Sequence, residues 1–371
     1  MKIKKIQGLN FRNYFSLNLD IEKDINVFFG KNAQGKTNIL ESIFYGALGL
    51  SYRTSQEENL ITFNNNQMMV YIEFTNNQDN HNVRIKKYFD NQRMVKEINL
   101  DGKKISLKDY YGFLNVVIFS PEDLQFVKGE PALRRRFLDM QISQTNKKYL
   151  ETLTQYNKVL KQRNSLLKQI REKETQENVL DTWDEKYIQL ATEIYLLRQP
   201  AIKKLQEIAN KIYQNISSGE TLQINYILKD IREKIIDNVE NYSQFLAEKI
   251  SAYRNIDIIR GVTSIGPHHD DLLLAVNEKL LKDFGSQGQQ RTVALALKLS
   301  QLEYIRQEIN EYPILLLDDV MSELDESRRS QLLQFIDKKV QTFITVNDKE
   351  LIPDLQDTAY YRIENGTINK I

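Results

Sequence analysis

The sequence of 371 residues contains no cysteine, which excludes disulfide bonds, thiolate metal sites and catalysis by a cysteine nucleophile. Long apolar runs are also missing, because no stretch approaches the ~20 residues that a membrane-spanning helix needs. Lys2, Lys4 and Lys5 are not followed by an apolar segment of secretory length, so no signal peptide is read. From these absences we expect a soluble, cytoplasmic protein.

An excess of charge of one sign is lacking as well. The 51 Lys and Arg residues oppose 50 Asp and Glu residues, and the net charge is +1. No global field therefore draws the chain to nucleic acid, and any contact with DNA must use a local basic patch. The chain is too long for one average compact domain, so we expect two folding units.

Residues 30–37 read GKNAQGKT and match the phosphate-binding pattern G-x-x-x-x-G-K-[ST] at every fixed position. An apolar strand precedes the loop at 25–29, and residues 38–48 have the apolar spacing of a helix. In this setting, backbone N–H groups and the positive helix end hold phosphate oxygens. Lys36 would reach the β and γ phosphates, and the Thr37 hydroxyl would bind Mg²⁺. A glycine turn that only joins a strand to a helix is the alternative.

A second part of the same site is expected near the other end of the chain. Pro313 starts an apolar run at 314–317 that ends on Asp318 and Asp319. Such a run fits a strand buried on both faces, and carboxylates at its end lie where open α/β sheets bind ligands. A glycine- and serine-rich turn at 284–289 precedes it and opens a long helical pattern.

The remaining pattern predicts antiparallel strands, two further sheet strands and a helical region. The expected antiparallel strands are 3–9, 14–21, 69–74, 83–89, 93–99 and 103–107, and the expected sheet strands are 116–119 and 341–346. Asp101-Gly102 is a strong hairpin turn, and Asn365-Gly366 is expected to turn a terminal hairpin. Residues 221–228 read as a strand and 229–253 as a helix.

Long, charged helices are predicted between about 132 and 213. One apolar stripe consists of Leu150, Leu153, Leu160 and Leu167, with Asn157 and Asn164 at the core positions between them, and a second runs from Trp183 to Ala201. The polar stretch 171–178 suggests a helical hairpin, and Pro200 is expected to kink or restart its second helix. Packing into a helical subdomain is favoured over an extended coiled coil.

Two of the three histidines stand together in residues 265–271, IGPHHDD, which read as a turn. A metal cluster is one interpretation. It is disfavoured, since adjacent side chains rarely converge on one ion without other ligands.

Residues 30–37, 284–291 and 314–325 resemble the Walker A, signature, Walker B and D-loop elements of ABC-type ATPase heads, and the helical insertion resembles SMC-like ATPases. The chain resembles the RecF family of bacterial recombination mediators more closely still. That resemblance rests on residues 11–14 (FRNY), 30–41, 120–124 (SPEDL), 134–139 (RRRFLD), 266–268 (GPH) and 285–291 (GSQGQQR). It implies an α/β fold, with an ABC-type ATPase head at 1–125 and 260–371 and a mainly helical arm domain at 126–259. The head would combine a mixed sheet and the Walker A helix with an antiparallel β subdomain.

Lys36, Asp318 and Asp319 are the expected catalytic residues. Asp318 would hold Mg²⁺ beside Thr37, and Asp319 would polarise the attacking water. A glutamate usually takes the latter role in ABC heads, and aspartate is one methylene shorter, so we expect slow hydrolysis. The resemblance implies that Ser286 and the helix start behind it cap the γ-phosphate of a second subunit, which predicts ATP-driven dimerisation. The expected ATP contacts are Arg12, Gly30, Lys31, Asn32, Ala33, Gln34, Gly35, Lys36, Thr37, Asn38, Ser286, Gly288, Gln289 and Asp325.

Some positions depart from the ABC pattern. No lid glutamine stands near 119–123, where Ser120 or Glu122 could substitute, and the switch histidine is missing at 345–347, which read TVN. His269 stands where relatives typically carry arginine. Arg12 resembles a basic residue that reaches nucleotide phosphate in SMC-like heads, and a capping ion pair between two strands is an equal alternative.

Local support for DNA binding comes from Arg53, Lys86, Lys87, Lys103 and Lys104, with further basic residues at 134–136 and 147–148. Phosphate contacts by such residues would be independent of sequence and sensitive to salt. Each cluster also fits a solvated face, and Arg134 to Arg136 could instead bind carboxylates across the domain boundary.

The resemblance implies that ATP and Mg²⁺ clamp a homodimer around duplex DNA near a single-strand gap or junction, and that slow, DNA-stimulated hydrolysis releases it. It further implies RecO and RecR as partners, help in loading RecA, and a place at the nucleoid. Two other classes remain open: a structural SMC-like head that bridges DNA, and the nucleotide-binding subunit of an ABC transporter.

Overall fold

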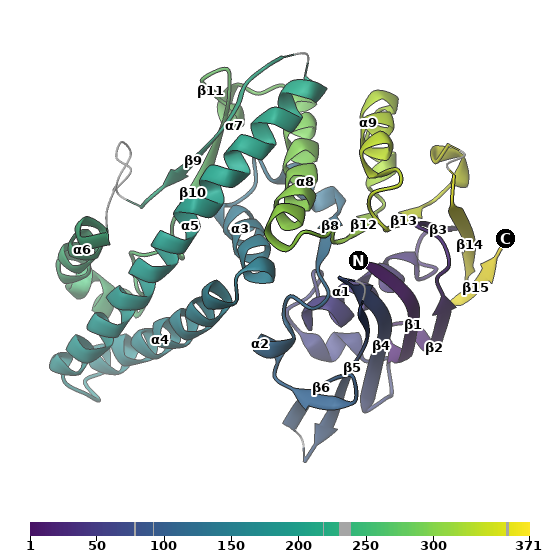
Figure 1. The fold of residues 1–371 in the computed structure, drawn as a ribbon. Helices are drawn as coiled ribbons and strands as arrows, with labels where there is room; N and C mark the ends of the chain where they lie inside the picture. Colours follow the sequence, from purple (N-terminus) through teal and green to yellow (C-terminus); the bar gives the residue numbers. More distant parts are fainter. Residues whose placement is uncertain (78, 92, 218, 230–238, 354–355) are drawn as a thin grey trace. The chain divides into compact units, whose positions relative to one another are not determined.

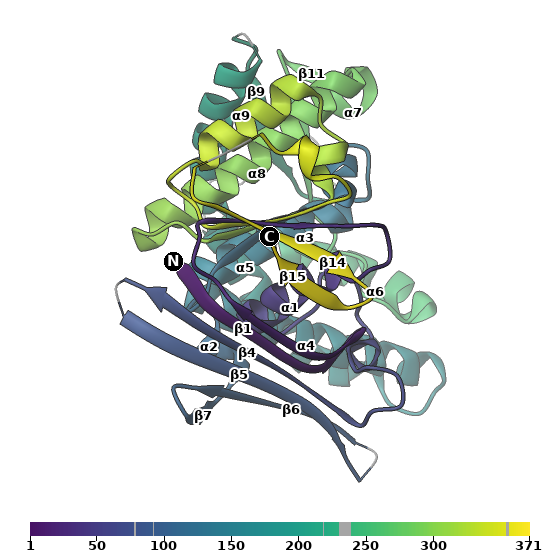
Figure 2. The same ribbon diagram turned by 90° about the vertical axis from the view of Figure 1, so that its right-hand side faces the viewer.

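The computed structural model describes residues 1–77, 79–91, 93–217, 219–229, 239–353 and 356–371. Its chain forms two compact units, one from Met1–Gln125 and Arg291–Ile371, the other from Phe126–Gln290. Their elements are drawn in two views (Figures 1 and 2). Residues 260–290, which the sequence assigns to the head, group with the helical unit; the division into functional domains stays a prediction.

The first unit contains a six-stranded antiparallel sheet in the order β2-β1-β4-β5-β6-β7. Its strands are β1 (Lys2–Phe11), β2 (Tyr14–Asp20), β4 (Gln67–Asn76), β5 (Asp79–Asp90), β6 (Arg93–Leu100) and β7 (Lys103–Ile105). Met68, Val70, Ile72 and Phe74 are buried on one face of β4, as the period of two requires. The predicted turn at 101–102 joins β6 to β7, and both of its residues have positive φ.

A second six-stranded sheet in this unit has the order β15-β14-β3-β13-β12-β8. Its strands are β3 (Ile25–Phe29), β8 (Val116–Phe119), β12 (Ile314–Asp318), β13 (Thr342–Val346), β14 (Thr358–Glu364) and β15 (Thr367–Lys370). All neighbours are parallel except β14 and β15, which form the predicted terminal hairpin. The carboxyl ends of β3, β12 and β13 therefore meet at one edge, where parallel sheets bind ligands.

Helix α1 (Lys36–Leu48) packs against strands of both sheets. Eleven of its 13 residues are buried, including the carboxylate-bearing Glu41. A helix that is buried on nearly all sides cannot shift without disturbing both sheets, so it gives the preceding loop a fixed base. The other helical elements of this unit are η1 (Glu57–Leu60), α2 (Leu107–Tyr110), η2 (Pro121–Gln125), most of α8 (Gln287–Ile309), η4 (Val320–Ser322), α9 (Glu326–Ile336) and η5 (Lys349–Leu351).

The second unit is mainly helical. Its elements are α3 (Pro131–Thr145), α4 (Lys147–Arg171), η3 (Glu177–Val179), α5 (Leu180–Ile216), β9 (Leu222–Ile227), α6 (Val239–Arg260), β10 (Asp271–Val276), β11 (Lys279–Leu280), α7 (Leu281–Phe284) and the start of α8. Helices α4 and α5 pack together as a hairpin, and α6 packs against both. The three strands form a small sheet in the order β11-β10-β9. The part of the predicted helix 229–253 that falls at 230–238 lies outside the described residues.

The predicted apolar stripe of α4 is wrong at most of its positions. Among its four leucines Leu167 is buried, whereas Leu150, Leu153 and Leu160 are half-buried, and Asn157 is exposed. The residues that α4 buries are Tyr149, Thr152, Tyr156, Val159, Arg163 and Leu167. This face is largely polar, and an apolar pattern cannot locate it.

Of the two outcomes predicted at Pro200, a restart does not occur, because α5 runs unbroken from Leu180 to Ile216, and a kink stays a prediction. Proline lacks the N–H that would bond to the carbonyl of Leu196. Burial of the neighbouring Arg198, Ala201 and Ile202 offsets that loss. In the described part of the chain, no helix combines the length and apolar character that crossing a membrane requires.

Candidate functional site

The loop at 30–35 connects β3 to α1 in a conformation that requires glycine at both ends. Gly30 has φ 148°, and a Cβ there would lie 2.4 Å from the carbonyl oxygen of Ile363. Gly35 has φ 112°, and a Cβ would lie 2.6 Å from Nδ2 of Asn13. Neither position admits a side chain without displacing its neighbours.

Gln34, in the same loop, is held by the terminal hairpin. The Asn365 N–H donates to Gln34 Oε1 at 2.6 Å, and the Gly366 N–H donates to the Gln34 carbonyl at 3.3 Å. Asn13 Nδ2 donates to the same carbonyl at 3.3 Å. The chain end thus supports the phosphate loop, a role that the sequence signal of a turn at 365–366 did not reveal.

The Lys36 ammonium points back into the loop. It donates to the carbonyls of Gly30 at 2.5 Å and Lys31 at 2.9 Å, and to Asn347 Oδ1 at 3.0 Å. Burial lowers the pKa of Lys36, and the nearby carboxylates of Asp319 and Asp318 oppose that shift. A cation enclosed by a loop of this shape is suited to a polyanion such as a nucleotide phosphate chain.

Asp318, at the end of β12, is held on both oxygens. Its Oδ1 accepts from the hydroxyls of Thr37 at 2.8 Å and Thr345 at 2.9 Å, and its Oδ2 accepts from the Tyr52 hydroxyl at 2.8 Å. The carboxylate and the Thr37 hydroxyl are hard oxygen ligands brought together from the two predicted halves of the site. This donor set fits Mg²⁺. Sequence reasoning identified Thr37 and Asp318 but missed Tyr52 and Thr345.

Asp319 follows in a left-handed backbone conformation, with φ 53° and ψ 18°. Within the described residues its buried Oδ1 has no hydrogen-bond partner. Burial raises the pKa of Asp319; Lys36 opposes the shift and Asp318 adds to it. A strained, partly unpaired carboxylate with a raised pKa has the properties of a proton acceptor for a reacting water.

Arg12 forms an ion pair with α1 and not between two strands. It donates to Glu41 through Nε at 2.8 Å and Nη2 at 2.7 Å. Arg53 donates to the same carboxylate at 3.1 Å, and Ser51 at 2.6 Å. Glu41 is fully buried. One carboxylate thus orders two arginines, and one positive charge remains in excess.

These two arginines line a cavity of 790 Å³ at the first turn of α1. Its other lining residues include Asn13, Asn38, Phe15, Phe63 and Phe89. Phe63 is 87% exposed and Phe15 68% exposed, which is unusual for phenylalanine and leaves two rings available to a flat ligand. Arg53, which the sequence assigned to DNA, therefore lies beside the first turn of α1, where it donates to Asn38 Oδ1 at 2.8 Å.

The signature turn belongs to the second unit and is built as a capping box. The Gln289 N–H donates to Ser286 Oγ at 3.1 Å, and the Ser286 N–H donates to Gln289 Oε1 at 3.1 Å. Gln289 Nε2 also donates to Glu220 at 2.8 Å. Gly288 lies in the first turn of α8.

Asp325, in the predicted D-loop, caps the N-terminus of α9. Its side chain accepts from the Arg328 N–H at 2.9 Å and pairs with the Arg328 guanidinium.

Ser120 donates to Asp123 through its N–H at 2.8 Å and its hydroxyl at 3.2 Å. Asp123 also pairs with Lys298.

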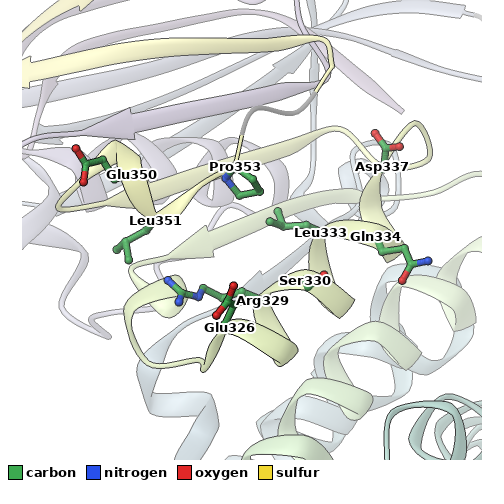
Figure 3. A pocket seen from close by; sticks show the side chains of 9 residues that line it. All are labelled: Glu326, Arg329, Ser330, Leu333, Gln334, Asp337, Glu350, Leu351 and Pro353. Atoms are coloured by element: carbon green, nitrogen blue, oxygen red, sulfur yellow. The ribbon is translucent and has the colours of Figure 1, made fainter.

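A separate cavity of 690 Å³ lies between α9 and the segment at 350–353 (Figure 3). Its lining residues are Glu326, Arg329, Ser330, Leu333, Gln334, Asp337, Glu350, Leu351 and Pro353. This lining includes none of the residues predicted to contact ATP or Mg²⁺.

Lys87 is not part of the exposed basic surface that the sequence predicts. It is 5% exposed and pairs with Glu57, which also binds Lys96 at 2.8 Å, so burial removes it from contact with solvent. Lys86 lies over the Tyr88 ring at 5.0 Å. Lys103 is exposed, and Lys104 pairs with Glu97 at the surface.

The basic cluster at 134–136 has a structural role at its first residue. Arg134 is 3% exposed and donates to both oxygens of Asp271, at 2.6 and 2.9 Å, within the second unit. Farther along this unit, Lys148 pairs with Glu193 at 2.8 Å.

The two-histidine turn is part of a buried hydrogen-bond network. His268 Nδ1 lies 2.5 Å from the Tyr156 hydroxyl, and burial lowers the pKa of His268 to about 3. His269 Nε2 lies 3.0 Å from the Thr263 carbonyl. Among the described residues, no group of three or more His, Cys, Asp or Glu side chains is placed to hold a metal ion.

Comparison with known proteins supplies a family. The family described as "RecF/RecN/SMC N terminal domain" matches residues 2–369. The chain is 41% identical over 371 residues to the DNA replication and repair protein RecF of Clostridium tetani (strain Massachusetts / E88), covering 99% of both chains. It is 40% identical to the RecF protein of Staphylococcus haemolyticus (strain JCSC1435), covering 100% of both.

Solved structures agree with these sequence relatives. A structure described as the recombination mediator protein RecF-ATP in the RecFOR pathway has a TM-score of 0.90 and 34% identity, over 100% of this chain and 97% of that chain. An Smc head bound to the C-winged helix domain of ScpA has a TM-score of 0.56 at 15% identity, a likeness of fold alone. The architecture is an ABC-type ATPase head with an inserted helical arm, and the chain belongs to the RecF family of SMC-like ABC-type ATPases.

Proposed function

We propose that this protein is an ATP-dependent DNA-binding mediator of recombination and repair. In this proposal it dimerises on ATP, recognises gapped DNA or single-strand/double-strand junctions, and helps load RecA together with RecO and RecR at the nucleoid, in the cytoplasm. The observation that carries the proposal is the convergence of Lys36, Thr37 and Asp318 at one sheet edge, in a chain that belongs to the RecF family.

The phosphate chain of ATP would lie along the backbone N–H groups of residues 30–38, and Lys36 would exchange its loop carbonyls for phosphate oxygens. The nucleoside would occupy the cavity beside Asn38, with Arg12 and Arg53 at its edge. Thr37 and Asp318 would hold Mg²⁺, which neutralises phosphate charge when bound. Asp319 would orient and deprotonate the attacking water.

We propose that hydrolysis at this site is slow. Asp319 is shorter than the usual glutamate and has few charge-stabilising neighbours besides Lys36. Positioning supplies most of phosphoryl-transfer catalysis, so a base held short of its water lowers the rate. We propose that DNA binding improves this alignment and thereby stimulates hydrolysis.

Ser286, Gly288 and Gln289 would complete the site of a second copy of the chain. The capping box at the start of α8 presents a helix N-terminus, which favours an anion such as a γ-phosphate. Asp325, half-exposed at the start of α9, would lie at the same dimer interface.

DNA would contact the outer face of the antiparallel sheet. Lys86 on β5 and Lys104 on β7 lie there on either side of β6, and Lys103 is exposed next to Lys104. Arg84, which the sequence did not single out, is exposed on the same face as Lys86 and lies 5.8 Å from the Tyr71 ring. Such residues bind phosphates without reading sequence.

The proposal is tested by sedimentation with Mg²⁺ and either ATP or ADP, with and without gapped duplex DNA. We expect a dimer with ATP, strengthened by gapped DNA more than by intact duplex, and a monomer with ADP. Lys36→Met should lose nucleotide binding, whereas Ser286→Arg should bind ATP and remain monomeric.

A monomer under every condition would overturn the clamp. Equal binding of gapped and intact duplex, without retention of RecR, would instead favour an SMC-like bridging head. Dimers that ignore DNA altogether would favour a transporter subunit.

A further inference from the structure

The carboxyl end of β13 lies between the two halves of the nucleotide site. In the sheet order, β13 separates β3, which leads into the phosphate loop, from β12, which ends on Asp318. Thr345 lies in β13 (Thr342–Val346), and Asn347 directly follows its last residue. Asn347 accepts from Lys36, and Thr345 contacts both carboxylate residues.

The Thr345 hydroxyl joins Asp318 and Asp319 through one oxygen. It donates to Asp318 Oδ1 at 2.9 Å and accepts from the Asp319 N–H at 2.9 Å. The residue is fully buried, so water cannot replace either bond. The same Asp319 N–H is also 3.2 Å from the Thr345 carbonyl.

Each bond constrains a different feature of the site. The bond to Asp318 sets the direction of a carboxylate that also faces Thr37. The bond from Asp319 N–H stabilises a left-handed backbone that is strained for an aspartate. Without it, only the longer bond to the Thr345 carbonyl would hold that N–H, so the Asp319 backbone would be less constrained and its unpaired Oδ1 would change direction.

We propose that Thr345 is the positioning residue that fixes the metal-binding carboxylate and the water-orienting carboxylate relative to each other. This inference rests on the proposed ATPase function of the same site. Tyr52 provides a natural contrast, because its hydroxyl donates to Asp318 Oδ2 at 2.8 Å, whereas the Thr345 hydroxyl bonds to both Asp318 and Asp319. Loss of Tyr52 would therefore disturb one carboxylate, and loss of Thr345 would disturb both.

The test compares Thr345→Val, Thr345→Ser and Tyr52→Phe with the wild type. Valine keeps the shape and removes the hydroxyl, whereas serine keeps the hydroxyl. We expect Thr345→Val to lower kcat about 10- to 100-fold at saturating Mg²⁺ and ATP, with a much smaller change in KM, and Thr345→Ser to restore most of it. Tyr52→Phe should raise the Mg²⁺ requirement and approach wild-type kcat when Mg²⁺ is increased.

A second measurement needs neither nucleotide nor metal. Amide hydrogen exchange at Asp319 should be faster in Thr345→Val than in the wild type, and unchanged in Thr345→Ser and Tyr52→Phe. An unfolding temperature equal to that of the wild type would show that the faster exchange in a variant is local.

Equal kcat in Thr345→Val and the wild type, or equal impairment of the valine and serine variants, would overturn the inference. So would a rate defect in Thr345→Val that Mg²⁺ repairs as fully as in Tyr52→Phe. A wild type that binds no ATP would instead overturn the proposed function, and the exchange result would then still decide whether Thr345 holds Asp319.

Discussion

At the scale of single residues, Glu41 is a buried carboxylate that holds two arginines in place. It accepts hydrogen bonds from Arg12, Arg53 and Ser51 while fully buried. A buried carboxylate is tolerated only with such partners, and the partners depend on it in turn.

Glu41→Gln is expected to destabilise the fold by about 3 kcal/mol, the low end for breaking a buried ion pair, because both arginines keep some contact with water. Ser51→Ala removes one hydrogen bond to the same carboxylate and should cost about 1 kcal/mol. Urea unfolding of the two variants measures both values. Equal costs would mean that the charge of Glu41 contributes little.

The site residues that could be predicted from sequence alone are those whose residue type and spacing follow a nucleotide-binding motif. Lys36, Thr37 and Asp318 converge as predicted because the loop pattern and the buried strand each require one location. Tyr52, Thr345 and Glu41 were missed, because each is an ordinary polar residue whose role exists only through neighbours brought close by the fold. For Lys87 the sequence predicted a DNA contact at a residue that is buried. An exposed lysine and a lysine paired to a glutamate far away in the sequence cannot be distinguished from sequence alone.

At the scale of elements, the periodicity of apolar residues predicted where many helices and strands lie. It did not always predict which face of a helix is buried. The strands follow the expected alternation. In α4, however, the buried face includes Arg163, which pairs with Asp184 at 2.6 Å and Asp257 at 2.9 Å. Its partners come from α5 and α6, so the sequence pattern of α4 alone cannot predict these ion pairs.

The turn between α6 and β10 contains two groups with opposite responses to pH. Burial lowers the pKa of His268 to about 3 and raises the pKa of Asp270 to about 6. Because the His268 pKa is lower in the folded state, its contribution to stability falls as pH decreases below about 6.5. Because the Asp270 pKa is higher in the folded state, its contribution rises as pH decreases from about 6 to about 4.

We therefore expect the two effects to offset each other in the wild type and to separate in variants. Relative to His268→Gln, the wild type should lose up to about 1.4 kcal/mol of unfolding free energy per unit of decreasing pH between about 6 and 4.5. Relative to Asp270→Asn, it should gain with the same slope. Urea unfolding at several pH values measures both differences, and parallel curves would show that neither group titrates as described.

At the scale of the whole molecule, a net charge of +1 means that the proposed DNA binding would depend on a few local contacts. Lys103→Gln with Lys104→Gln is expected to weaken DNA binding at every sequence and to reduce the slope of log K against log salt by about 1 to 2. Lys2→Gln, which removes an exposed lysine paired to Asp24, is the matched control and should leave the slope unchanged. An unaltered slope in the double variant would place the DNA elsewhere.

The order of strands in the mixed sheet has a consequence for how the protein is made. A ribosome completes β3 and β8 early, but β13 and β12, which lie between them, emerge only after the entire helical unit. Until then β3 and β8 have unpaired edges, and the phosphate loop faces no acidic partner. A nascent chain therefore carries its whole glycine loop long before it can bind nucleotide productively, and that gap gives chaperones a defined intermediate to protect.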